Sequence, residues 1–189
     1  MSKPLAIVSA PIDTYSGYGA RARDFIKALI KCDKYDVKIL GQRWGNTRFG
    51  YLQDHNEVDL AKRMIPKLET KPKLWIQVTV PNEFQSIGKY NIGFTAGIET
   101  TIAAPEWIEG LNRMDMNIVS SKHARQIFQT SRFEKRNEQT NEVMGVVELQ
   151  KPVEVLFEGA NLEKYFPSKE KSSIDLSEIK ESFAYLFVG

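Results

Sequence analysis

Residues 5–41 read LAIVSAPIDTYSGYGARARDFIKALIKCDKYDVKILG, and the order of their apolar runs decides the fold class. The short apolar run Leu5 to Ala10 predicts a buried strand. Apolar residues then recur at helical spacing over residues 20–32, and Asp36 to Leu40 predicts a second strand. A strand, a helix and a second strand in this order predict an α/β fold, a parallel sheet with helices on its faces.

The helix expected over residues 20–32 has one apolar face. The spacing i, i+3, i+4, i+7, i+8 is met by Ala22, Phe25, Ile26, Leu29 and Ile30. We expect the polar residues to lie away from that face; they are Arg21, Arg23, Asp24, Lys27 and Lys31.

The rest of the chain continues the alternation of strands and helices. Strands are predicted at residues 74–80, 90–96, 116–119 and 153–157, and helices at residues 105–114 and 121–130. Residues 42–56 are polar and punctuated by glycine, which predicts a long loop, and residues 57–65 have weak helical periodicity. This pattern extends the parallel sheet by several strands.

Residues 131–151 interrupt the alternation. Two strand-like segments, 132–136 and 143–149, flank the polar stretch 137–141. This arrangement predicts an inserted β-hairpin.

The carboxyl-terminal part divides into two further segments. Residues 167–182 contain a Ser- and Lys-rich stretch, which is typical of a linker. Residues 183–189, FAYLFVG, have the apolar composition of a buried strand. We therefore expect a domain of residues 1–166, a linker, and the first strand of a second domain.

Composition excludes several classes of protein. The chain of 189 residues has a net charge of +2, which gives no electrostatic footprint for nucleic acid or an anionic membrane. No apolar run approaches the ~20 residues of a membrane span. Cys32 is the one cysteine, and with only His55 and His123 beside it no zinc-type ligand cluster is expected. We expect a cytoplasmic protein without a resident metal or cofactor.

The sequence Gly17-Tyr18-Gly19-Ala20-Arg21-Ala22 fits G-x-G-x-x-A and opens the first helix. Glycines in this position let a phosphate approach backbone N–H groups at the positive end of a helix. The glycines lie at least seven residues after the first strand, and no acidic residue ends the second strand, so nicotinamide binding is disfavoured. Two interpretations stay open: a backbone loop near a phosphate or sugar with Arg21 or Arg23 as charge partner, and an ordinary surface loop.

Glu99 follows the strand predicted at 90–96 and precedes the helix that begins at Pro105. That places it at the carboxyl edge of the sheet, where α/β folds bind ligands. A carboxylate there can act as a general base or stabilise positive charge on a sugar. The alternatives are that Glu99 caps a backbone N–H group or pairs with a surface lysine. No second carboxylate lies near it in the sequence.

Ser121 and Lys122 begin a helix at the same predicted edge. A hydroxyl group and free N–H groups at a helix start can hold an anion. Ser121 can equally serve as an N-cap. His123 is expected to be a surface residue.

Residues 92–128 contain an ordered series of motifs: Ile92-Gly-Phe-Thr-Ala-Gly-Ile-Glu-Thr-Thr101, Pro105-Glu106-Trp107, Leu111-Asn112, Met114-Asp115, Ser120-Ser121-Lys122-His123 and Phe128. This series resembles the amino-terminal half of family-4-like (group 1) glycosyltransferases of the GT-B fold. The segments 153–161 and 165–167 resemble the part that closes this domain, where the family usually reads Glu-Gly-Val-Asp in place of Glu158-Gly159-Ala160-Asn161.

The resemblance extends over nearly the whole chain, apart from residues 42–56 and 131–151. Residues 183–189 resemble the first strand of the second, donor-binding domain of these enzymes. The insertion at residues 131–151 and the sequence Ile98-Glu-Thr-Thr101 resemble those of glycosyltransferase-like proteins of large marine bacteriophages.

The resemblance implies a Rossmann-like acceptor-side domain that faces a downstream donor-binding domain across a cleft. It implies a retaining, metal-independent transfer from a nucleotide sugar to an acceptor, in the cytoplasm, or the host cytoplasm for a phage protein. It implies a catalytic role for Glu99. The implied substrate-binding residues are Gly17, Tyr18, Gly19, Arg21, Thr100, Ser121, Lys122, Glu158 and Asn161.

The isolated chain is expected to be inactive, because transition-state stabilisation in this fold needs groups from both domains. The alternative function is a non-catalytic carbohydrate- or nucleotide-binding module. A nucleotide-dependent oxidoreductase is the least favoured interpretation. Neither nucleic-acid binding nor a membrane span is predicted.

Overall fold

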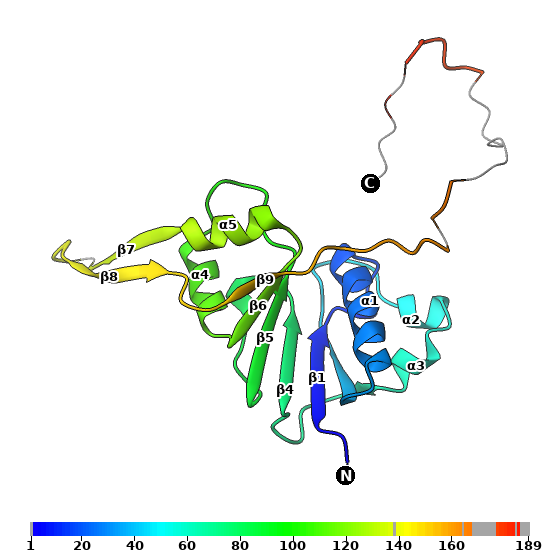
Figure 1. The fold of residues 1–189 in the computed structure, drawn as a ribbon, viewed down its shortest axis with the longest axis horizontal. Coiled ribbons are helices and arrows are strands. Elements are labelled where there is room, and N and C mark those ends of the chain that lie inside the picture. The colour runs from blue at the N-terminus through cyan, green and yellow to red at the C-terminus, as the bar shows by residue number, and fades with distance from the viewer. Residues whose placement is uncertain (1, 138, 164, 168–176, 184, 186–189) are drawn as a thin grey trace. The chain divides into compact units, whose positions relative to one another are not determined.

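A computed structural model describes residues 2–137, 139–163, 165–167, 177–183 and 185 (Figure 1). The chain divides into two compact units, residues 1–158 and residues 159–189, and each is described by itself. Most of the strand expected at 183–189 and more than half of the expected linker lie outside the described residues.

Within the described residues, a sheet of seven parallel strands forms the centre of the first unit, in the order β3-β2-β1-β4-β5-β6-β9. The strands are β1 (Leu5–Ala10), β2 (Asp36–Gly41), β3 (Met64–Ile65), β4 (Leu74–Val78), β5 (Tyr90–Thr95), β6 (Met116–Val119) and β9 (Val153–Val155). The first six follow the Rossmann order. The predicted α/β class with a parallel sheet is confirmed.

Helices lie on both faces of the sheet (Figure 1). One face carries α1 (Gly17–Lys31), with α2 (Tyr51–Asp54) and α3 (Val58–Ala61) beside it, and the other carries α4 (Pro105–Asn112) and α5 (Lys122–Thr130). Each layer encloses its own core, because successive strand residues point to opposite faces. Val8 packs in the core that includes Ile26 of α1, whereas Ile7 packs in the core that includes Leu111 and Phe128.

Helix α1 differs from the prediction at its start and on its polar face. It begins at Gly17 rather than near residue 20, because Ser16 Oγ accepts a hydrogen bond of 2.9 Å from the N–H group of Gly19. Arg23 was expected to face solvent but is buried, with an exposed fraction of 5%. Its Nη1 donates to the carbonyl oxygens of Ile12 and Thr14, at 2.8 and 2.9 Å.

The region predicted as a long loop contains α2, and the helix expected over residues 57–65 is reduced to α3 followed by strand β3. The Asp13 carboxylate holds α2, because it accepts hydrogen bonds from the N–H groups of Gly50 and Leu52, at 3.2 and 2.8 Å. Asp13 lies at least 37 residues before both partners in the sequence, so local sequence patterns could not show the contact.

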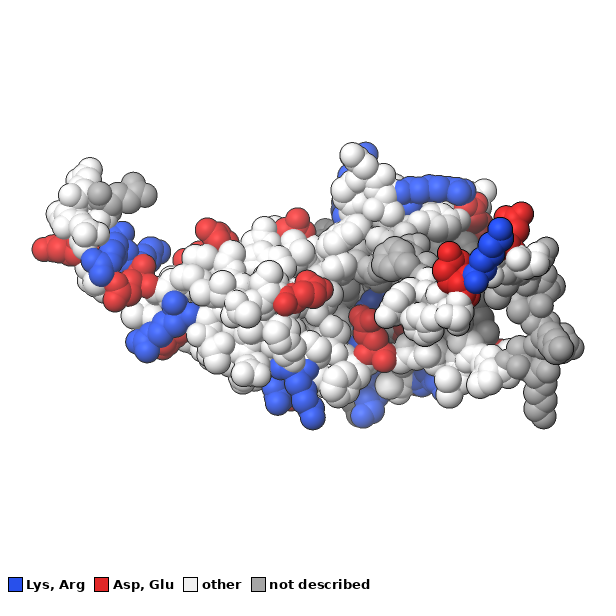
Figure 2. Space-filling model, turned by 90° about the horizontal axis from the view of Figure 1, so that it is seen from above, with Lys and Arg blue, Asp and Glu red and all other residues white. Residues whose placement is uncertain are grey.

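The predicted hairpin is confirmed as β7 (Arg132–Arg136) and β8 (Val143–Glu148), paired antiparallel. Asn112 holds its base: its Nδ2 donates to Glu148 O at 2.8 Å, and its Oδ1 accepts from Gln150 N at 2.7 Å. Basic and acidic side chains alternate along the hairpin at the left of Figure 2, and no large patch of one sign forms on the face shown.

Candidate functional site

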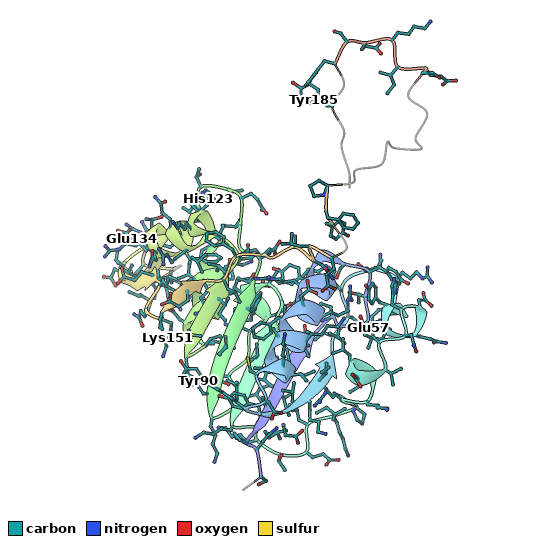
Figure 3. The ribbon with its side chains drawn as sticks, turned by 45° about the vertical axis from the view of Figure 1, so that its right-hand side comes forward. Glu57, Tyr90, His123, Glu134, Lys151 and Tyr185 are labelled. Carbon is teal, nitrogen blue, oxygen red and sulfur yellow. The ribbon has the colours of Figure 1, made fainter. Side chains whose placement is uncertain are left out.

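The side of the sheet to which successive strands are added changes at β1. Strands β2 and β3 lie on one side of it, whereas β4 and the later strands lie on the other. Chains leaving the carboxyl ends of β1 and β4 therefore diverge, and ligands of open α/β sheets bind at such a switch point. In Figure 3, His123 lies near the end toward which the strands run and Tyr90 near the opposite end. The candidate site is the carboxyl end.

Tyr18, in the first turn of α1, crosses this switch point. Its hydroxyl oxygen shares a hydrogen bond of 2.9 Å with Thr95 Oγ1 and accepts one of 3.1 Å from the N–H group of Ala96. Because β4 lies between β1 and β5, the side chain passes over the end of β4. Burial raises the pKa of Tyr18, and the charges of Glu99 and Glu83 raise it further, while the bonds from Thr95 and Ala96 oppose the shift.

Replacing Tyr18 with phenylalanine should lower stability in a pH-dependent way. The loss of the hydroxyl removes its hydrogen bonds with Thr95 Oγ1 and the Ala96 N–H group, at a cost of about 1 kcal/mol at pH 8. The folded pKa of Tyr18 is raised above the unfolded value of about 10, so the tyrosine's contribution is complete below pH 10 and is lost as the pH rises through the folded pKa. Urea unfolding of both proteins at pH 8 and pH 11 should show the difference shrinking. An unchanged difference would contradict the prediction.

Trp44 stacks on Tyr18, with ring centroids 4.2 Å apart and an angle of 30° between the planes. The segment that carries it is fixed to the end of β1. Gln42 N donates to Ala10 O at 2.9 Å, and Gln42 Nε2 donates to Ser9 Oγ at 2.7 Å. The sequence analysis did not single out Trp44. The available signal was an aromatic residue in a polar segment directly after the carboxyl end of a strand.

The two glycines of the first helix have different roles. A Cβ atom on Gly19 would lie 2.6 Å from Thr14 O and 2.8 Å from Pro11 O, so glycine lets the helix pack against the preceding loop. A Cβ atom on Gly17 would meet nothing within 4 Å. The N–H groups of Gly17 and Tyr18 have no intrahelical acceptor, so the positive end of α1 faces the switch point.

Both arginines of α1 bind the protein's own backbone. Arg21 Nη2 donates to the carbonyl oxygens of Leu156 and Phe157, at 2.8 and 3.1 Å. Arg23 is bound to the loop between β1 and α1, as described above. The geometry therefore disfavours either side chain as a phosphate ligand.

Glu99 lies in the exposed loop between β5 and α4. In the described part of the chain its carboxylate has no hydrogen bond or ion pair, so neither capping nor pairing with a lysine occupies it. The loop itself is held by α5 and by Ser120, which follows β6: Ser120 Oγ donates to Ala96 O at 2.6 Å, and His123 Nε2 of α5 lies 3.2 Å from Thr100 O. Gly97, with φ of +103°, would place a Cβ atom 2.3 Å from Ala124 Cβ. Helix α5 thus fixes the loop that carries Glu99 and Thr100.

Glu83 is a second carboxylate near the switch point, and the sequence analysis missed it. It belongs to η1 (Pro81–Glu83), which follows β4, and it accepts a hydrogen bond from Thr79 Oγ1. Its charge and that of Glu99 both act on Tyr18. Sixteen residues separate the two carboxylates in sequence, and pairing of β4 with β5 brings their loops to one edge.

The remaining predicted residues lie at several places. Ser121 is the N-cap of α5 and accepts a 3.0 Å hydrogen bond from Ala124 N, so the capping interpretation is confirmed. Lys122 is exposed in the first turn of α5, and Glu158 is exposed at the end of the first unit. Asn161 belongs to the second unit, where its Oδ1 accepts from Glu163 N at 3.0 Å.

Among the described residues, no group of three or more His, Cys, Asp or Glu side chains is placed to hold a metal ion. In the same part of the chain, no helix combines the length and hydrophobicity that crossing a bilayer requires. Comparisons with protein-family models, with curated proteins and with solved structures find no match to this chain.

Proposed function

We propose that this chain is the acceptor-side part of a retaining, metal-independent glycosyltransferase of the cytoplasm that uses a nucleotide sugar. The observation that carries the proposal is the Glu99 carboxylate in the loop after β5, which has no hydrogen bond or ion pair in the described part of the chain and whose charge helps to raise the pKa of Tyr18 at the switch point of a Rossmann-ordered sheet. The ordered motifs of residues 92–128 and their resemblance to GT-B enzymes support the same conclusion. The donor-binding groups would come from a further domain.

The groups at the carboxyl end of the sheet suit the chemistry of sugar transfer. A carboxylate without a protein partner can accept the hydrogen bond, and then the proton, of an acceptor hydroxyl group as that group attacks the anomeric carbon from the side on which the nucleoside diphosphate leaves, so that the configuration is retained. The starts of α1 and α5 place partial positive charge at the same edge, where it would stabilise the negative charge of a departing nucleoside diphosphate. Neither role needs a bound metal ion.

The test is a transfer assay on the full product of the gene. Glu99→Gln keeps the shape of the side chain and removes its charge, and we expect kcat to fall at least tenfold, a loss of about 1.4 kcal/mol of transition-state stabilisation. Release of the nucleoside diphosphate from a panel of nucleotide sugars is the measurement. The matched control is Glu69→Gln, at an exposed position between β3 and β4, which should retain full activity. A folded protein that releases no nucleoside diphosphate with any sugar would overturn the proposal.

A non-catalytic binding module is the second candidate. The observation that favours it is the commitment of both Arg21 and Arg23 to backbone carbonyl groups, which leaves the start of α1 without a free arginine for a diphosphate. Saccharide or nucleotide binding by the full protein without any release of nucleoside diphosphate would establish this candidate instead.

A further inference from the structure

We infer that the acceptor is a carbohydrate whose ring packs on Trp44, an inference that rests on the proposed function. The starting observation is the Trp44–Tyr18 stack at the switch point. Tyr18 covers one face of the indole. Trp44 is half-buried, so part of the residue is accessible to a ligand.

An aromatic face next to polar groups suits a sugar ring. The ring face of an aromatic side chain is electron-rich and attracts the weakly positive C–H groups that line one face of a pyranose. The hydroxyl groups around the same pyranose need hydrogen-bonding partners at its rim. Beside the stack lie the Tyr18 hydroxyl and Thr95 Oγ1, which share a hydrogen bond of 2.9 Å. A lipid chain would need a continuous apolar groove, which these polar groups interrupt.

A second aromatic group of the molecule is already occupied by its own partners. Tyr51 stacks on His55, with centroids 3.9 Å apart, and the Arg23 guanidinium carbon lies 3.4 Å from the Tyr51 ring centre. Tyr15 packs edge-on against Tyr51, and Arg48 lies over the Tyr15 ring. These contacts tie α2 to the loop after β1. The observations therefore favour Trp44, not this group, as the platform.

The platform is positioned before any ligand arrives. Gln42 fixes the start of its segment to β1 through one backbone and one side-chain hydrogen bond. Tyr18 is fixed in turn by Thr95 and Ala96. A saccharide would therefore meet an ordered surface, which reduces the entropy cost of binding.

The experiment measures saccharide binding by the 189-residue chain through the indole N–H signal of Trp44 in two-dimensional NMR. The probes are maltotriose, mannotriose and triacetylchitotriose at millimolar concentrations. We expect at least one of them to shift the Trp44 signal. Trp44→Ala should weaken that affinity about tenfold or more, which corresponds to about 1.4 kcal/mol. Trp44→Phe keeps a ring and should restore part of it, and Tyr15→Ala should bind as the wild type does.

The outcomes separate this inference from the proposed function. No shift with any probe, or equal affinity in Trp44→Ala and wild type, overturns the platform. In the full protein, release of nucleoside diphosphate with an acceptor KM that Trp44→Ala leaves unchanged supports the transferase function and refutes the role of Trp44 as the platform. Saccharide binding at Trp44 without any release of nucleoside diphosphate supports the platform and refutes the transferase function.

Discussion

Gly110→Ala is expected to lower the free energy of unfolding by about 3 kcal/mol, although alanine is the better helix former. Gly110 lies in α4 and is buried against η1. A Cβ atom there would lie 1.8 Å from Pro81 O and 2.4 Å from Pro81 C, far inside van der Waals contact. The obstacle is backbone, which cannot rotate away as a side chain can.

The η1 segment is also held in place by Arg113, the C-cap residue of the same helix α4. Arg113 Nε donates to Phe84 O at 2.7 Å, and Arg113 Nη2 donates to Asn82 O at 2.7 Å. Relief of the clash would break these bonds or move α4 off its core. Because the segment also contains Glu83, the substitution should disturb the carboxyl edge.

Urea denaturation followed by circular dichroism measures the effect. The matched control is Gly17→Ala, which also places alanine in a helix, at a position with no atom within 4 Å. There the better helix propensity should leave stability unchanged or raise it by a few tenths of a kcal/mol. Equal midpoints for the two variants would show that the α4–η1 contact is not tight.

Arg23→Met is the second substitution with a large expected effect, a loss of about 3 kcal/mol. Methionine retains much of the length of the side chain but donates no hydrogen bond. The carbonyl groups of Ile12 and Thr14, on residues that are fully buried, would lose their donor, and each unpaired group costs about 1–3 kcal/mol. The contact of the guanidinium with Tyr51 would be lost as well.

Arg23→Lys should recover only part of this loss, because an ammonium group does not reproduce the planar geometry that serves two carbonyl groups and an aromatic face. Arg43→Met is the control: Arg43 is exposed and has no side-chain hydrogen bond or ion pair in the described part of the chain. Chemical denaturation of the three variants measures their free energies of unfolding, which should rise in the order Arg23→Met, Arg23→Lys, Arg43→Met. Similar stabilities of Arg23→Met and Arg43→Met would refute the structural role of the buried guanidinium.

The sheet was largely predictable from the sequence. The mainly apolar runs 5–10 and 116–119 match their strands, since a strand buried on both faces is apolar along most of its length. Strand β3 was missed because two residues, Met64 and Ile65, carry no periodicity. Helix α2 was missed because its stabilising partner, Asp13, is remote in the sequence.

The candidate site was predictable in part. The edge could be located, because residues that follow parallel strands share one end of the sheet. Tyr18 and Glu99 were singled out in this way, whereas Trp44 and Glu83 were not, since they come from the segments after two other strands. Helical spacing predicted that Arg23 would face solvent, and this prediction was wrong. The buried guanidinium is stabilised by its hydrogen bonds to the carbonyl groups of Ile12 and Thr14, which the spacing of apolar residues does not reveal.

The central position of β1 has a consequence for synthesis on the ribosome. Strand β1 can pair with β2 as soon as β2 is made, but its other edge must wait for β4, which is completed at Val78. Residues 42–78 separate the two events, and at about 5–20 residues per second their translation takes about 2–7 s. During that interval the nascent chain exposes an apolar strand edge. A chaperone that binds during these seconds would cover that edge until β4 is made.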